Sequence, residues 1–239
     1  MVGDQLNYLG KNKILFINGI SHKYYEYIIN SGLYLSGSVA QILFAFFSQP
    51  FYARYLSAED YGILGYYTSV QGFFTPLFLF GMTQFYLMNY FRKSTKENKE
   101  TLFNILFMLS IVNVIISVLG CVGLKIIYRT INISVPLMPF AVYIFIILYF
   151  NVYSAFLLIN LRIRKKAILF FIFTAVPPAL NVFWGLIFVI LFKMGAAGKL
   201  LGQSITNLTI GLLSVYYLRK FITFKITLNF EFIRKSFPH

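Results

Sequence analysis

Six long apolar stretches separated by short polar segments are the feature that most constrains how this chain can fold. They lie near residues 28–53, 61–91, 101–124, 136–160, 167–192 and 200–218. About 20 apolar residues in a helix cross a hydrocarbon core of about 30 Å. Hydrophobic residues make up 59% of the chain and charged residues 12%, too little charge for the surface of a water-soluble protein. The sequence therefore predicts an all-α, polytopic membrane helix bundle of about six transmembrane helices.

The placement of the basic residues predicts the orientation of these helices. The chain has 21 Lys and Arg against 7 Asp and Glu, a formal charge of +14. If the six stretches cross in turn, five basic residues fall on one side: Arg54, Lys125, Arg129, Lys193 and Lys199. The other sixteen fall on the side that holds both termini. Because cytoplasmic loops are enriched in Lys and Arg, both termini are expected to be cytoplasmic. The basic clusters are therefore interpreted as topology signals, and no nucleic-acid partner is expected.

Acidic residues are excluded from the apolar stretches. All seven lie outside them: Asp4, Glu26, Glu59, Asp60, Glu97, Glu100 and Glu231. His22 and His239 also lie outside, and Cys121 is the single cysteine. Carboxylates or histidines inside a membrane mark proton relays, cation sites and metal centres. Because the six stretches hold none, we predict no catalytic residue, no metal site and no cofactor, and we do not expect an enzyme.

Neutral polar residues recur at helical spacing within the apolar stretches. Such stripes are typical of helix–helix seams, where small and hydroxylic residues allow close packing. Alternatively, several stripes line a hydrated cavity for a polar solute, because amides are costly against lipid unless they are hydrogen-bonded. Asn and Gln supply both donors and acceptors, as sugar hydroxyls require. The amides that favour a cavity are Gln41, Gln49, Asn113, Asn151, Asn181, Gln203 and Asn207. All but Asn151 are taken as candidate substrate-binding residues.

Two of the stretches contain helix-breaking residues. The second is too long for one straight crossing, and we expect it to tilt, protrude or break near Gly72, Pro76 or Gly81. Pro177 and Pro178 lie in the middle of the fifth. Two prolines remove two backbone donors and kink a helix, so the freed carbonyls must face protein or water. Broken helices are common in transporters, but a purely structural kink explains this pair as well.

A motif between the first two stretches resembles a known family. The segment Pro50-Phe51-Tyr52-Ala53-Arg54-Tyr55-Leu56-Ser57-Ala58-Glu59-Asp60-Tyr61-Gly62 follows a stretch that contains Gly37-Ser38-Val39-Ala40-Gln41. It resembles the N-terminal signature of bacterial polysaccharide (O-antigen) flippases, the Wzx-like branch of the multidrug/oligosaccharidyl-lipid/polysaccharide exporter superfamily. In that family the first span ends in "ar-y-L-s-p-e-e-Y-G", and a glycine such as Gly81 follows in the second. The order of the spans extends the resemblance over nearly the whole chain.

The resemblance implies a substrate and a mechanism. The substrate would be an oligosaccharide on an undecaprenyl diphosphate carrier, flipped across the bacterial inner membrane for surface polysaccharide and lipopolysaccharide synthesis. Flipping would occur by alternating access between two six-helix lobes. Family members have twelve to fourteen spans, so this chain is expected to be an N-terminal lobe, with membrane lipid and a second lobe as partners. Residues 1–27 would be a cytoplasmic or interfacial segment, 28–218 the lobe, and 219–239 a cytoplasmic tail leading toward the second lobe.

The same motif contains local signals of its own. Ser57 and Asp60 have the spacing of a capping box at a helix start, where Glu59 and Asp60 would lie at the positive end of the helix dipole. Arg54 is a candidate contact to the carrier diphosphate. Alternatively, it snorkels to the interface or pairs with one of these acids. Helical phasing puts Arg54 beside Phe47, off the polar stripe, unless Pro50 resets the phase.

Two further interpretations of the whole chain stay open. The first is a six-span membrane enzyme of surface-glycan assembly, which would need a base or nucleophile that the apolar stretches do not offer. The second is a truncated, non-transporting remnant, or a subunit that pairs with another six-span chain. The number of spans in the native product separates the second interpretation from a transporter lobe.

Overall fold

The structure, a computed structural model, describes residues 2–131 and 135–223, with side chains from residue 28 onward. The described residues form helices and no strand, which confirms the all-α prediction. In chain order the helices are α1 (Val2–Tyr55), α2 (Ala58–Leu79), α3 (Met82–Tyr90), α4 (Thr95–Ile131), α5 (Phe140–Ile163), α6 (Ala167–Leu186), the π-helix η1 (Ile187–Leu191), α7 (Gly195–Leu218) and the 3-10 helix η2 (Arg219–Phe221). The roles predicted for the side chains of residues 1–27 and for residues 224–239 lie outside this description.

Four helical segments of the described chain are long and apolar enough to cross a membrane. They are Ile28–Tyr55 of α1, Thr95–Thr130 of α4, all of α5, and Ala167–Leu191, which joins α6 to η1. The sequence predicted six crossings, and the other two correspond to α2 with α3 and to α7. α2 and α3 are two pieces of one broken stretch, and α7 carries a row of polar residues. Neither is therefore a continuous apolar helix.

The break in the second stretch lies at Gly81, one of the three positions predicted for it. Phe80 and Gly81 both adopt the left-handed conformation, with φ values of 46° and 64°. The Phe80 N–H donates to the Pro76 carbonyl, which closes the last turn of α2. Glycine tolerates a positive φ without steric cost, so Gly81 can reverse the backbone before α3 begins. Pro76 itself lies inside α2.

The predicted capping box at the start of α2 is confirmed. The Ser57 hydroxyl accepts a hydrogen bond from the Asp60 backbone N–H at 3.1 Å. The Asp60 carboxylate accepts one from the Ser57 backbone N–H at 3.0 Å. Two of the orphan donors at the helix start are therefore satisfied.

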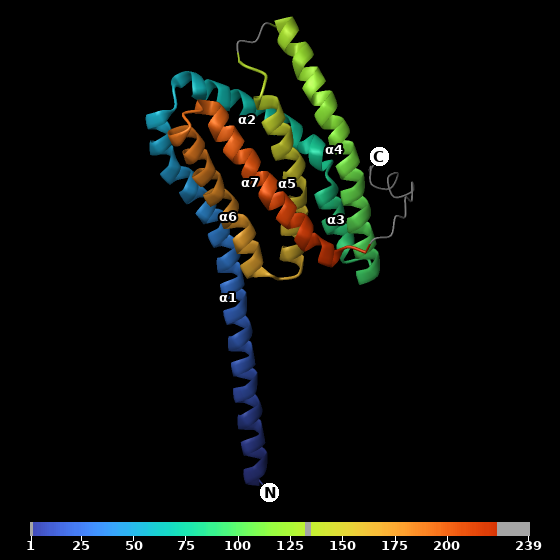
Figure 1. Ribbon diagram of the computed structural model, residues 1–239. Coiled ribbons are helices and arrows are strands. Elements are labelled where there is room, and N and C mark those ends of the chain that lie inside the picture. Colours follow the sequence, from blue (N-terminus) through green and yellow to red (C-terminus); the bar gives the residue numbers. More distant parts are fainter. Residues whose placement is uncertain (1, 132–134, 224–239) are drawn as a thin grey trace.

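α1 packs along α6, and the two helices run in the same direction (Figure 1). Thr174 of α6 lies against Gly37 of α1, and further along both helices Gly185 lies against Tyr52. From the first contact to the second the residue number increases in both helices, so α1 and α6 run parallel. Small residues at both contacts allow the close approach that membrane helices use in place of large apolar side chains.

α7 lies between α5 and α6 and runs antiparallel to α6 (Figure 1). At the α6–α7 crossing, a Cβ added to Gly202 would lie 2.6 Å from the backbone nitrogen of Gly185. Only glycine therefore fits at position 202. On its other side, Gly211 of α7 packs under the ring of Phe150 from α5. α1, α5, α6 and α7 together form one half of the bundle.

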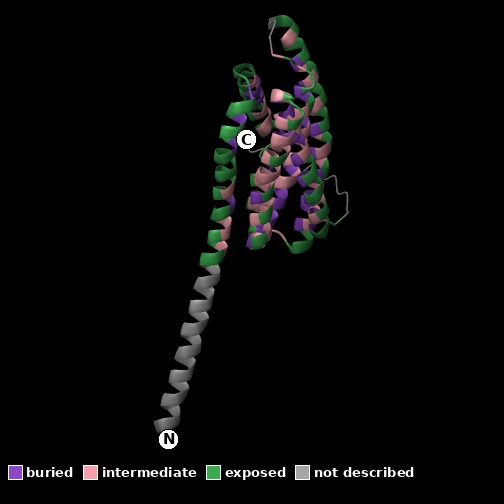
Figure 2. Ribbon diagram, turned by 60° about the vertical axis from the view of Figure 1, so that its left-hand side comes forward, coloured by how far each residue is buried: buried purple, intermediate pink, exposed green. Residues whose placement is uncertain are grey.

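The outer faces of the bundle are apolar. On α1, Leu35, Ile42 and Phe46 are 67–70% exposed. Exposed residues follow the outward faces of α1 and α4, whereas buried residues gather between the helices (Figure 2). Monomeric soluble proteins rarely expose apolar surface on this scale. The exposed surface therefore agrees with a bundle surrounded by lipid.

The helix connections gather at two ends of the bundle (Figure 1). The first, here the Ser57 end, holds the corner between α1 and α2, the start of α5 and the α6–α7 turn. The second, here the Arg164 end, holds the α3–α4 turn, the α5–α6 turn and η2. At the Ser57 end the Tyr67 hydroxyl donates to the Pro136 carbonyl at 2.6 Å. At the Arg164 end the Arg164 guanidinium lies 4.2 Å from the centre of the Phe221 ring.

Candidate binding cavity

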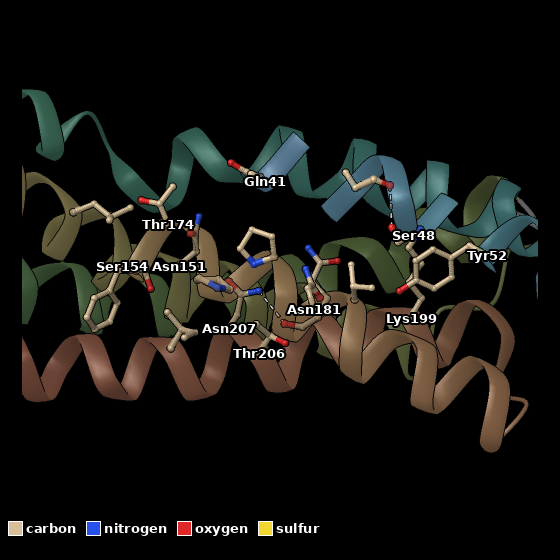
Figure 3. Close-up of a pocket in the computed structure, with 18 of the residues that line it drawn as sticks. Gln41, Ser48, Tyr52, Asn151, Ser154, Thr174, Asn181, Lys199, Thr206 and Asn207 are labelled. Carbon is tan, nitrogen blue, oxygen red and sulfur yellow. Dashed lines mark hydrogen bonds between the residues drawn. The ribbon is translucent and has the colours of Figure 1, made fainter. Parts of the chain in front are cut away.

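A polar cavity of about 440 Å³ lies among α1, α5, α6 and α7 (Figure 3). Its walls combine amides, hydroxyls and a single ammonium group with apolar side chains. The polar residues that line it are Gln41, Ser48, Gln49, Tyr52, Asn151, Ser154, Thr174, Asn181, Lys199, Gln203, Thr206 and Asn207. Its volume is within the range of small-molecule binding sites.

Five of the seven candidate residues line this cavity. Gln41 and Gln49 project from α1, Asn181 from α6, and Gln203 and Asn207 from α7. The polar stripes of three separate stretches therefore face the same space. The interpretation of these stripes as cavity lining, rather than only as helix seams, agrees with this arrangement.

Asn113 lies away from the cavity, on α4. It is 1% exposed, and its side-chain nitrogen donates to the Phe78 carbonyl at 3.2 Å. Phe78 is in the last turn of α2, where backbone carbonyls lack a helical donor. Asn113 therefore satisfies the backbone beside the break at Gly81. Its position follows from α4 packing against α2 and α5 rather than against α7.

Arg54 also lies outside the cavity. It is in the last turn of α1 and is exposed. α1 continues as an α-helix through Pro50, so the proline does not reset the helical phase. Arg54 remains on the face that simple phasing assigns to it, away from Gln41 and Gln49.

Lys199 is the charged lining residue that is absent from the candidates predicted from the sequence. Its ammonium nitrogen lies 4.3 Å from the centre of the Tyr52 ring, within the range of a cation–π interaction. Among the described residues that line the cavity, none carries a carboxylate. A signal for it exists in the sequence: Lys199, Gln203 and Asn207 are spaced by four residues and so share one face of a helix.

Several polar side chains in the wall donate their hydrogens to their own helices. The hydroxyls of Ser48, Thr174 and Thr206 donate to the carbonyls of Ala45, Phe170 and Gly202 at 2.9, 2.8 and 2.9 Å. The Asn207 amide nitrogen donates to the Gln203 carbonyl at 2.9 Å. The oxygen atoms of these four side chains keep free lone pairs as acceptors.

The lining of the cavity offers hydrogen-bonding groups and one positive charge to a ligand. Within residues 28–131 and 135–223, no group of three or more His, Cys, Asp or Glu residues is placed to hold a metal ion. The lining can hydrogen-bond to hydroxyl and amide groups, and Lys199 can neutralise one negative charge. These properties favour a ligand that is rich in hydroxyl groups and carries an anionic group.

Comparisons with known proteins identify no family for this chain. No family model, curated protein or solved structure matches the chain.

Proposed function

We propose that this chain is a transporter lobe that flips lipid-linked oligosaccharides, carried on undecaprenyl diphosphate, across the bacterial inner membrane. The observation that carries the proposal is the amide-lined cavity with Lys199 at one end, inside a bundle whose outer faces are apolar. A flippase must shield a polar headgroup while the carrier tail stays in lipid. A polar cavity beside an apolar surface meets both needs.

The distribution of charge supports six crossings with a cytoplasmic N-terminal segment. The Arg164 end carries ten basic residues: Arg92, Lys93, Lys96, Lys99, Arg162, Arg164, Lys165, Lys166, Arg219 and Lys220. The opposite end carries fewer, among them Arg54 and Lys193. Because positive residues accumulate on the cytoplasmic side, the Arg164 end would be cytoplasmic and the Ser57 end periplasmic.

Lys199 is the preferred contact to the diphosphate. It faces the cavity, and none of the described residues that line the cavity is a carboxylate, so its charge is available to a ligand. Arg54 stays a second candidate, because it lies at the same end of the bundle as Lys199. It ranks second because it lies outside the cavity. The resemblance of residues 50–62 to polysaccharide flippases supports the same substrate class and a second six-helix lobe as the partner.

Lipid binding to purified protein tests the proposal. Native mass spectrometry would compare undecaprenyl diphosphate with undecaprenol, which has the same tail and no charge. We expect the protein to prefer the diphosphate. Lys199→Gln should reduce that preference by about 10- to 100-fold, the effect of losing hydrogen bonds to a charged group.

Two further variants make the test specific. Lys193→Gln removes a charge near the same end of the bundle without touching the cavity, and it should keep the preference. Arg54→Gln decides between the two candidate cations. Equal binding of undecaprenol and undecaprenyl diphosphate by the native protein would overturn the proposal.

A further inference from the structure

The Pro177–Pro178 pair, where the sequence predicts a kink of α6, forms part of the cavity wall. Pro177 and Pro178 line the cavity together with Phe173 and Thr174, the residues four positions before them. In an α-helix the carbonyl of residue i accepts from the N–H of residue i+4. Since proline has no N–H, the carbonyls of Phe173 and Thr174 lack their helical donors.

These two carbonyls belong to residues that line the cavity. A proline ring lies over the carbonyl four residues earlier and pushes it away from the helix axis. Because both prolines and both carbonyl-bearing residues line the same cavity, a ligand in it would lie beside the stretch of α6 that lacks these two i+4 donors. An unpaired carbonyl in a membrane must find a donor in protein, water or ligand.

The side chains around the kink add more acceptors. Thr174, Thr206 and Asn207 have already donated hydrogens to their own helices. Their remaining oxygen lone pairs, with the carbonyls of Phe173 and Thr174, make this part of the wall an acceptor surface. A ligand that binds here must supply several hydrogen-bond donors.

We propose that the Pro177–Pro178 kink is the subsite for the sugar of the ligand, whose hydroxyl groups donate to the Phe173 and Thr174 carbonyls. This inference rests on the proposed function. It also orients the ligand, because Lys199 and Tyr52 lie at one end of the cavity and Thr174 lies toward the other (Figure 3). The anionic group faces Lys199 at the Ser57 end, and the sugar extends along α6 toward Thr174.

Alanine substitutions at the prolines provide the test. In Pro177→Ala the new N–H pairs with the Phe173 carbonyl, and in Pro178→Ala with the Thr174 carbonyl. Each single variant removes one acceptor and keeps the other proline to maintain the kink. Alanine favours helix over proline, so both variants should fold, which thermal unfolding would check. Thr174→Val is a further variant, which removes a side-chain acceptor and leaves both prolines in place.

The measured quantity is a ratio of two dissociation constants: that of bare undecaprenyl diphosphate divided by that of the same carrier bearing N-acetylglucosamine. The native protein should bind the glycosylated carrier more tightly. Each variant should reduce this ratio by about 3- to 10-fold, the effect of one hydrogen bond. Pro76→Ala is the matched control, since Pro76 lies inside α2 and away from the cavity. It should keep the native ratio.

The outcomes separate this inference from the proposed function. The native protein could prefer the diphosphate over undecaprenol while all three variants at the kink keep the ratio of the native protein. That result would overturn the sugar subsite and leave the proposed function intact. A ratio near one in the native protein would do the same. No preference for diphosphate in the native protein would overturn the proposed function and the subsite with it.

Discussion

The carboxylate of Asp60 accepts a hydrogen bond from the backbone N–H of Ala196, with the oxygen 2.7 Å from the nitrogen. The same carboxylate closes the capping box with Ser57. One side chain therefore satisfies donors at the first turns of both α2 and α7. Lys199 lies one turn beyond Ala196, so Asp60 also helps to hold the part of α7 that carries the charge in the cavity.

Asp60→Ala should lower the free energy of unfolding by about 2 kcal/mol, because two helix starts lose an acceptor. Equilibrium unfolding in SDS, followed by the fluorescence of Trp184, the single tryptophan, measures the change. Glu59→Ala is the control, since Glu59 carries the same charge in the same turn and is exposed. Equal losses in the two variants would contradict the role given to Asp60.

The Asp60 carboxylate should also make stability depend on pH in the acidic range. Burial raises its pKa, but hydrogen bonds from Ala196 and Ser57 outweigh this and hold the pKa below its ordinary value of 3.8. The unfolded chain then binds a proton at a higher pH than the folded protein does. The stabilisation is therefore fully present above about pH 4 and is lost as the pH falls through the folded value.

Unfolding of the native protein and of Asp60→Ala at several pH values measures this contribution. The difference in unfolding free energy between them should stay constant from pH 8 to pH 5 and shrink below pH 3.8. A difference that is the same at pH 3 as at pH 7 would show that the charge of Asp60 does not stabilise the fold.

Lys199→Met should stabilise the protein while it weakens ligand binding. Lys199 is partly buried, and no carboxylate lines the cavity among the described residues, so its charge is desolvated without an ion pair. Replacing a group kept for binding commonly raises stability by about 0.5–2 kcal/mol. The melting temperature should rise, whereas the exposed Lys193→Met should leave it unchanged. A marked loss of stability in Lys199→Met would make Lys199 a structural residue instead.

Gly202→Ala should destabilise the bundle by about 1–3 kcal/mol, the usual effect of overpacking. The added methyl group would meet the backbone of Gly185, which cannot move without separating α6 from α7. Gly65→Ala in α2 is the control, because nothing lies within 4 Å of its added Cβ. It should be neutral or stabilising by up to about 1 kcal/mol. SDS unfolding of both variants measures the contrast.

Local signals predicted local structure well. The capping box of Ser57 and Asp60 and the break at Gly81 each depend on a few neighbouring residues. The sequence predicts the capping box directly, and Gly81 is one of the three positions at which it predicts a break. The candidate site was harder to predict. Five candidate residues line the cavity, whereas Asn113 pairs with a carbonyl of α2 and Arg54 is exposed. Lys199 is harder to predict, because a lysine between two apolar stretches has the sequence signature of a loop charge.

The sequence by itself determined the helices, their apolar faces and the polar stripes along them, because these follow from residue type and a period of 3.6 residues. Only the tertiary structure decided which stripes meet. Asn113 and Asn207 lie on similar stripes of two different helices, yet one satisfies a helix end and the other lines a cavity. The difference arises from the neighbours of α4 and α7. Helical periodicity shows which residues share a face of a helix, but packing decides which neighbour that face meets.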